Sequence, residues 1–166
     1  MIDFNTEEAR ALPGSFSAFD MEYLYRAIKD LKKGDVYLEV GVQYGRSLDF
    51  VKRNSKADVF GIDIDKELYE PVKGANFIHK ESNEAVKDWT LPINVLFIDG
   101  DHSYEGCKND WDNFSPFVVS NGWVFFHDCD STSPGVEKVF DEIGKGWVKK
   151  SKSLNPRCSM AWVRKV

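Results

Sequence analysis

The chain has 166 residues, the length of a single domain, with 42% hydrophobic and 14% aromatic residues and a net charge of −5. This acidic balance argues against a protein whose main task is to bind nucleic acid, because neutralising phosphates requires a basic face. No apolar run approaches the ~20 residues that span a bilayer and the first residues do not resemble a signal peptide, so we expect no membrane association.

The chain begins with a segment, residues 1–34, that we expect to form a loop and one helix. Pro13 and Gly14 interrupt regular structure early in this segment. Apolar residues then recur at helical spacing from Phe19 to Leu31, and Gly34 ends the helix.

From residue 35 onward, short apolar runs alternate with amphipathic segments. The predicted strands are 36–40, 58–63, 75–79, 93–98 and 123–126, and the predicted helices are 45–54, 83–89, 104–114 and 134–144. Strands that are apolar on both faces and separated by helices predict a parallel sheet with helices on both sides.

The last two predicted strands, 147–153 and 159–163, have only a short turn between them, which predicts an antiparallel hairpin. We therefore expect an α/β fold in one domain over residues 1–166, with a doubly wound, Rossmann-like core in residues 35–166.

The three cysteines, Cys107, Cys129 and Cys158, are widely spaced and odd in number, and no C-x-x-C motif occurs. This pattern predicts neither a disulfide framework nor a structural zinc site, and it fits a reduced, cytoplasmic setting.

Charged residues follow the predicted strands at their carboxyl ends, where open parallel sheets bind ligands. The acids at these ends are Glu39, Asp63, Glu81, Asp99, Asp101 and Asp128. Two histidines, His102 and His127, accompany the acids after the fourth and fifth strands. The sequence thus predicts a functional site along this edge of the sheet.

The first turn of this edge favours an adenosine-type ligand. Gly41 and Gly45 allow a tight turn and close approach of a ligand, and Asp63 stands at the end of the next strand, where a carboxylate often accepts hydrogen bonds from ribose hydroxyls. Gln43 occupies a position where a dinucleotide motif has glycine, and Glu39 would repel a pyrophosphate but could accept from an ammonium group. These residues favour S-adenosylmethionine over a nicotinamide cofactor.

Four segments resemble the class I S-adenosylmethionine-dependent methyltransferases. They are E-x-G-x-x-x-G-x-S at 39–47, G-I-D at 61–63, I-D-G-D-H-S-Y-E at 98–105 and F-H-D at 126–128. More narrowly, they are similar to the compact branch that includes macrocin-type sugar O-methyltransferases and cephalosporin-hydroxylase-like proteins. The resemblance runs from about Val36 to the C-terminus. It implies the strand order 3-2-1-4-5-7-6 and methyl transfer to a hydroxyl, less readily an amine, of a small molecule or sugar.

The resemblance also implies roles for individual residues. The implied cofactor-binding residues are Glu39, Gly41, Gly45, Ser47, Asp63, Ile64, Ser82 and Asp99. Metal-dependent relatives hold a divalent ion at positions that correspond to Asp99, His127 and Asp128, so Mg²⁺ or Mn²⁺ is a candidate cofactor. Asp101 would accept the proton of the acceptor hydroxyl, with His102 as the alternative base.

Two departures from the family keep other functions open. His127 stands where relatives often carry an acid, and the chain has no evident lid insertion, so residues 1–34 or a second subunit would have to complete the acceptor pocket. The alternatives are a nucleotide-binding module or subunit without catalytic activity, and a nicotinamide-dependent oxidoreductase. The 12 Phe, 6 Tyr and 5 Trp predict an aromatic-rich surface that makes a homodimer plausible.

Overall fold

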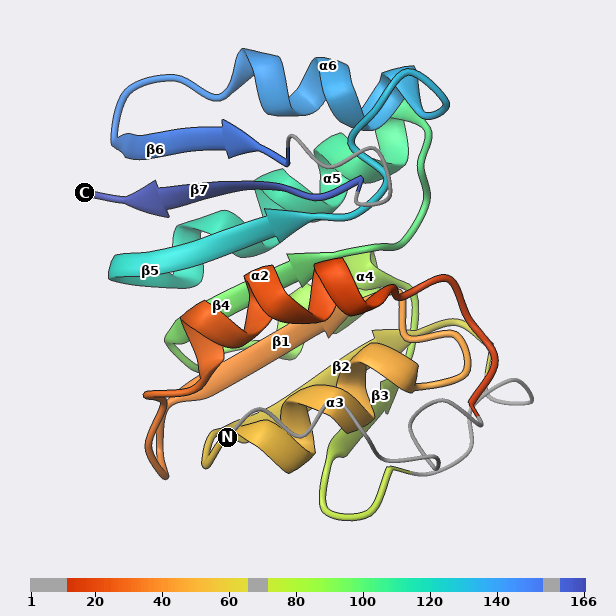
Figure 1. The fold of residues 1–166 in the computed structure, drawn as a ribbon, viewed down its shortest axis with the longest axis vertical. Coiled ribbons are helices and arrows are strands. Elements are labelled where there is room, and N and C mark those ends of the chain that lie inside the picture. Colours follow the sequence, from red (N-terminus) through yellow and green to blue (C-terminus); the bar gives the residue numbers. More distant parts are fainter. Residues whose placement is uncertain (1–11, 66–71, 154–158) are drawn as a thin grey trace.

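The computed structural model describes residues 12–65, 72–153 and 159–166, which form an α/β domain (Figure 1). In chain order the elements are α2 (Ala18–Ile28), β1 (Val36–Val40), α3 (Arg46–Asn54), β2 (Asp58–Asp63), β3 (Asn76–His79), α4 (Ser82–Ala85), the 3-10 helix η1 (Val86–Asp88), β4 (Ile93–Ile98), α5 (Tyr104–Phe114), the 3-10 helix η2 (Ser115–Phe117), β5 (Val118–Phe126), α6 (Pro134–Glu142), β6 (Trp147–Lys152) and β7 (Ala161–Lys165).

The strands form one sheet in the order β3-β2-β1-β4-β5-β7-β6, which confirms the predicted topology. Strands β1 to β5 pair in parallel, whereas β7 pairs antiparallel with both β5 and β6. The predicted hairpin is therefore present, although its turn lies outside the described residues, as do residues 1–11 and Cys158.

Helices cover both faces of the sheet. In Figure 1, α2 and α3 lie in front of the strands, and their apolar side chains pack with one set of strand residues, such as Tyr37 and Phe97. The other face, with Leu38 and Leu96, packs against residues of α5 and α6. Strand β1 lies between β2 and β4 and is buried along its whole length.

The start of α2 is fixed by a capping box. The Ser17 hydroxyl accepts a hydrogen bond from the Asp20 N–H (3.2 Å), and the Ser17 N–H donates to Asp20 Oδ2 (2.7 Å). These reciprocal bonds satisfy backbone donors that a helix start would otherwise leave free. They also direct the Asp20 carboxylate inward, where the residue is 2% exposed.

Strand β5 is longer than the predicted segment 123–126, because it already begins at Val118. Asn121 adopts φ 67°, and the register with β4 shifts between Ile93 and Val95. An Asn-Gly pair is typical of a turn, but here it lies within an irregular strand. The sequence therefore does not show that the strand continues through it.

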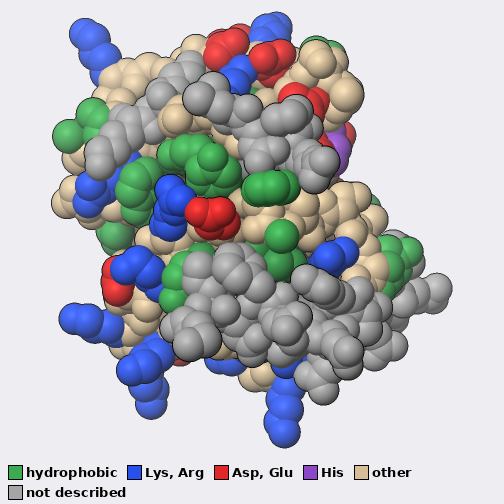
Figure 2. Space-filling model, in the orientation of Figure 1, with side chains coloured by type: hydrophobic (Ala, Val, Ile, Leu, Met, Phe, Trp, Pro, Cys, Tyr) green, Lys and Arg blue, Asp and Glu red, His purple; other side chains and the backbone are tan. Residues whose placement is uncertain are grey.

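Aromatic side chains lie half-buried on the sheet face beside α2. Tyr23 of α2 packs on Trp162 of β7 with ring centroids 4.7 Å apart, and Figure 2 shows hydrophobic side chains at the surface over these strands. Cys107 and Cys129 are buried and free. Among the described residues, no helix has the length and apolar character needed to cross a bilayer.

Candidate functional site

A cavity of about 680 Å³ lies at the carboxyl end of the parallel strands. Its walls come from residues 13–16, the turn after β1, the ends of β2, β4 and β5, and the first turns of α5. All of the predicted site residues line this cavity except Glu39 and Gly45. The fold thus brings together side chains that are up to 115 positions apart in the chain, from Pro13 to Asp128.

The turn after β1 requires glycine at its first position. Gly41 has φ 87°, and a Cβ atom there would lie 2.2 Å from the Asp99 carbonyl oxygen. Gly45, at φ 80°, caps α3 and donates its N–H to the Val42 carbonyl (2.8 Å). Gly45 therefore closes the turn at the start of α3, whereas Gly41 allows the backbone after β1 to lie against the backbone after β4.

Asp63 organises the same turn through its carboxylate. Oδ2 accepts hydrogen bonds from the backbone N–H groups of Val42 and Gln43, both at 2.8 Å, and Oδ1 accepts from Asp65 N–H at 2.9 Å. Each carboxylate oxygen can accept about two hydrogen bonds, so Oδ1 keeps capacity for a ligand. Next to it, Ile64 is 65% exposed, and its apolar side chain fits the packing of a flat base.

Glu39 differs from its predicted position in the cofactor site, because it is fully buried beneath the cavity. Its Oε1 accepts from the Ser47 hydroxyl, and its Oε2 accepts from the Tyr37 hydroxyl at 2.8 Å. Burial raises the pKa of Glu39 to about 8, although the two hydrogen bonds oppose the shift. In this arrangement Glu39 supports the turn and Ser47, and it does not face the cavity.

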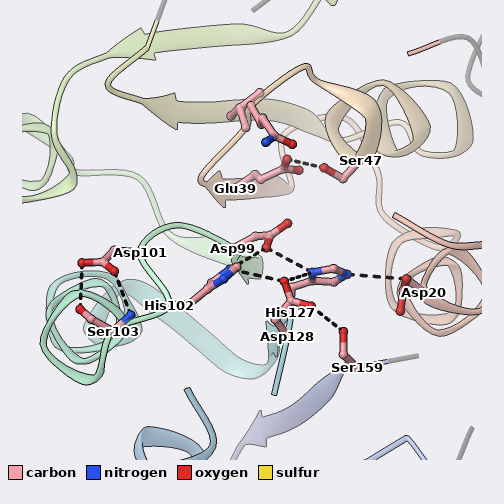
Figure 3. A network of polar contacts seen from close by, with 12 residues as sticks. Asp20, Glu39, Ser47, Asp99, Asp101, His102, Ser103, His127, Asp128 and Ser159 are labelled. Atoms are coloured by element: carbon pink, nitrogen blue, oxygen red, sulfur yellow. Dashed lines mark hydrogen bonds and ion pairs between the residues drawn. The ribbon is translucent and has the colours of Figure 1, made fainter. Parts of the chain in front are cut away.

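His127 lies between carboxylates at the base of the cavity (Figure 3). Its Nδ1 is 3.2 Å from both Asp99 Oδ1 and Asp128 Oδ2, and its Nε2 is 3.6 Å from Asp20 Oδ2. Burial opposes a positive charge on this ring, but the contacts with Asp128, Asp20 and Asp99 outweigh it and raise the pKa of His127 to about 12. The three carboxylates around His127 thus favour the protonated form of its ring.

His102 reaches the same carboxylates from the cavity side, and its side chain is 40% exposed. Its Nε2 lies 3.4 Å from Asp99 Oδ1 and 3.5 Å from Asp128 Oδ2. The contact with Asp99 is the main reason that the pKa of His102 is raised. The two carboxylates orient the ring and increase its basicity.

Asp101 points away from this cluster towards the start of α5, as Figure 3 shows. Its Oδ1 accepts from Ser103 N–H and its Oδ2 from the Ser103 hydroxyl, both at 2.8 Å. These hydrogen bonds lower the pKa of Asp101. Of the two predicted bases, His102 is thus the one that lies among the other site residues with a raised pKa.

The cluster offers donors for a divalent ion. One ligand atom from each of Asp99, His102 and Asp128 lies within 4.8 Å of the others. Two carboxylate oxygens and one imidazole nitrogen are a donor set that fits Mn²⁺ or Mg²⁺. The predicted ligand His127 approaches the same carboxylates from behind, and its role as a ligand stays a prediction.

Sequence reasoning missed three residues of the site: Asp20, Arg46 and Asp110. Asp20 follows Ser17 by three positions, a spacing that is typical of a helix start. This spacing does not indicate that Asp20 also contacts His127. Asp110 lies on the apolar side of α5 between Cys107 and Phe114, and burial raises its pKa to about 6. An acid on the apolar stripe of a helix is a signal that could have been noticed.

The chain resembles known proteins in sequence and in fold. Residues 38–129 match the protein family described as a methyltransferase domain. The uncharacterized protein R132 of Acanthamoeba polyphaga mimivirus is 29% identical over 136 residues, which cover 66% of this chain and 61% of that protein. The chain therefore spans less than two thirds of this relative.

Two solved structures show the same fold. The O-methyltransferase from Bacillus cereus in complex with SAH superimposes with a TM-score of 0.71 at 11% identity, covering 95% of this chain and 84% of that one. MycE from the mycinamycin biosynthetic pathway, in complex with Mg, SAH and mycinamycin VI, gives a TM-score of 0.66 at 18% identity, covering 90% of this chain and 49% of that one.

Proposed function

Because the chain belongs to the methyltransferase-domain family, as a class I S-adenosylmethionine-dependent methyltransferase, we propose that it methylates a hydroxyl group of a small molecule or sugar. An amine is the less favoured acceptor. His102 accepts the proton that the hydroxyl loses, and Asp99 and Asp128 orient the imidazole ring.

The position of His102 is the observation that carries this proposal. A hydroxyl is a weak nucleophile at neutral pH, so its proton must pass to a base within hydrogen-bond reach. His102 is half-exposed in the cavity wall, whereas Asp101 is occupied by two hydrogen bonds from Ser103. A base oriented by a third group is the arrangement that activates hydroxyl nucleophiles in other enzymes.

The cofactor is S-adenosylmethionine, whose sulfonium supplies an activated methyl group to a nucleophile held in line. We propose that Asp63 accepts from the ribose hydroxyls and that Ile64 and Ser82 border the adenine. Asp63 Oδ1 retains accepting capacity, and all three residues line the cavity. Gly41 keeps the backbone close enough for the ligand to lie against it.

Metal assistance is a second form of this proposal, favoured by the convergence of Asp99, His102 and Asp128. These residues would hold Mg²⁺ or Mn²⁺, which would lower the pKa of a bound hydroxyl. His102 would then be a ligand, and Asp101 would be the base. The MycE structure, which contains Mg, SAH and mycinamycin VI together, supports this form and an acceptor of the sugar or small-molecule class. The B. cereus O-methyltransferase supports oxygen as the methyl acceptor.

The decisive experiment is a screen for SAH release with sugar and small hydroxyl acceptors, with and without Mn²⁺, followed by two variants. His102→Asn should lower kcat by about 10²–10⁴-fold, the usual contribution of a general base, and should leave the affinity for SAH unchanged. Asp101→Asn should lower kcat by no more than about 10-fold.

The opposite ranking, with Asp101→Asn inactive and His102→Asn active, would make Asp101 the base. A loss of turnover on metal chelation that Mn²⁺ restores would support the metal-assisted form. SAH binding without turnover on any acceptor would favour a nucleotide-binding module instead of an enzyme.

A further inference from the structure

One cation in the cavity wall, Arg46, has no acidic partner among the described residues. Arg46 is the first residue of α3, and its Nη1 donates to the Gly14 carbonyl at 2.8 Å. Its Nε is buried and has no hydrogen-bond partner in the part of the chain that the structure describes. The same holds for ion pairs: none of the described carboxylates lies within 4.0 Å of the Arg46 guanidinium.

The other charged side chains of the cavity are mostly acids. The second basic side chain in its wall, Lys80, already pairs with Asp88 at 2.7 Å. The acids that line the cavity are Asp63, Glu81, Asp99, Asp101, Glu105, Asp110 and Asp128. A partly buried guanidinium without a counter-charge is unfavourable, so this cavity is organised for a ligand that brings its own anionic group to Arg46.

S-adenosylmethionine has the matching charges. Its sulfonium and ammonium groups are cations and suit a wall of carboxylates, whereas its carboxylate is its one anion. A planar guanidinium binds a carboxylate through two parallel N–H···O hydrogen bonds, so Arg46 is the natural partner for this group. Arg46 begins α3 next to Ser47, and both residues line the cavity.

We propose that Arg46 binds the carboxylate of the methionine part of the cofactor. This inference rests on the proposed function and deepens it. Arg46 then has two tasks. One amino group of the guanidinium holds the segment at Gly14, and the other amino group is left for the ligand.

The test compares two ligands by titration calorimetry on the full chain. SAH carries both the ammonium and the carboxylate, whereas decarboxylated SAH keeps the ammonium and lacks the carboxylate. Arg46→Gln should weaken SAH binding by about 10- to 100-fold, the effect of a lost hydrogen bond to a charged group. The affinity for decarboxylated SAH should stay the same. Arg46→Lys, which keeps the charge but not the paired N–H groups, should recover part of the loss.

Arg53→Gln is the matched control, because Arg53 lies on the same helix, pairs with Asp49 and does not line the cavity. It should change neither affinity. Equal weakening of both ligands by Arg46→Gln would mean that Arg46 only supports the segment at Gly14, and an unchanged SAH affinity would assign the guanidinium to something other than the cofactor. Either result overturns the inference while the methyltransferase function stands. Failure of the unaltered chain to bind SAH would overturn both.

Discussion

Glu39 shows how burial separates two residues that the sequence groups together. The motif at 39–47 suggested that Glu39 and Ser47 both touch the cofactor, yet Glu39 is fully buried and uses Ser47 as a hydrogen-bond donor. The Glu39 carboxyl group accepts hydrogen bonds from Tyr37 and Ser47. Its pKa of about 8 means that it is largely protonated at neutral pH.

This protonation makes stability depend on pH. The pKa of Glu39 in the folded chain lies above its ordinary value of 4.5, so the folded chain holds a proton that the unfolded chain releases. The contribution is fully present below pH 4.5 and is lost as the pH rises to about 8. Glu39→Gln, which carries no ionisable proton, should therefore flatten the decline in unfolding free energy over this window. Urea titrations of both proteins across the window measure it, and parallel curves would contradict the assignment.

At the scale of elements, α2 does more than cover the sheet. Its capping box directs Asp20 to the imidazole of His127, so a helix that precedes the parallel core balances a charge at the end of β5. The expected lid was absent from the sequence, but residues 13–16, which lead into α2, line the cavity. That the N-terminal segment completes the acceptor pocket stays a prediction.

Asp20→Asn should destabilise the fold by about 3–5 kcal/mol, because it removes one partner from a buried pair and leaves His127 with less compensation. The amide can still accept from Ser17 N–H, so the helix start itself should persist. Asp30→Asn is the control just beyond α2, where an exposed pair with Lys29 should contribute little. Chemical unfolding of the two variants should separate them clearly. Similar values would mean that the contact with His127 contributes little.

The sequence predicted regular elements well and contacts between distant elements poorly. Strands β1, β2 and β4 have the predicted bounds, because their apolar runs end in glycine or acids that punctuate the chain. The long β5 escaped prediction because its irregularity at Asn121 imitates a turn. The contacts of Asp20 with His127 and of Arg46 with Gly14 escaped it because nothing local distinguishes such residues from an ordinary helix start.

At the scale of the whole molecule, cofactor binding should raise thermal stability. A ligand at 100 times its Kd adds about 2.7 kcal/mol to the folded state. For a domain of this size, that corresponds to a rise in Tm of about 5–10 °C. Differential scanning fluorimetry with SAH measures the shift. Asp63→Ala, which removes the predicted ribose acceptor, should show a much smaller shift from its own starting Tm, and an equal shift would remove Asp63 from the binding site.

The attachment of residues 12–17 to the rest of the domain has a consequence for engineering. Two contacts anchor the segment and the helix that it begins: the Gly14 carbonyl on Arg46, and Asp20 on His127. Phe16 is buried against Phe50 and Phe97, and Ser17 caps α2, so both must be kept as well. A library that varies the exposed residues Pro13 and Ser15 would then offer new cavity walls to acceptors without disturbing the parallel core. Chimeras that exchange the whole segment with a relative should fold only when the donor sequence supplies an acid for the imidazolium at the end of β5.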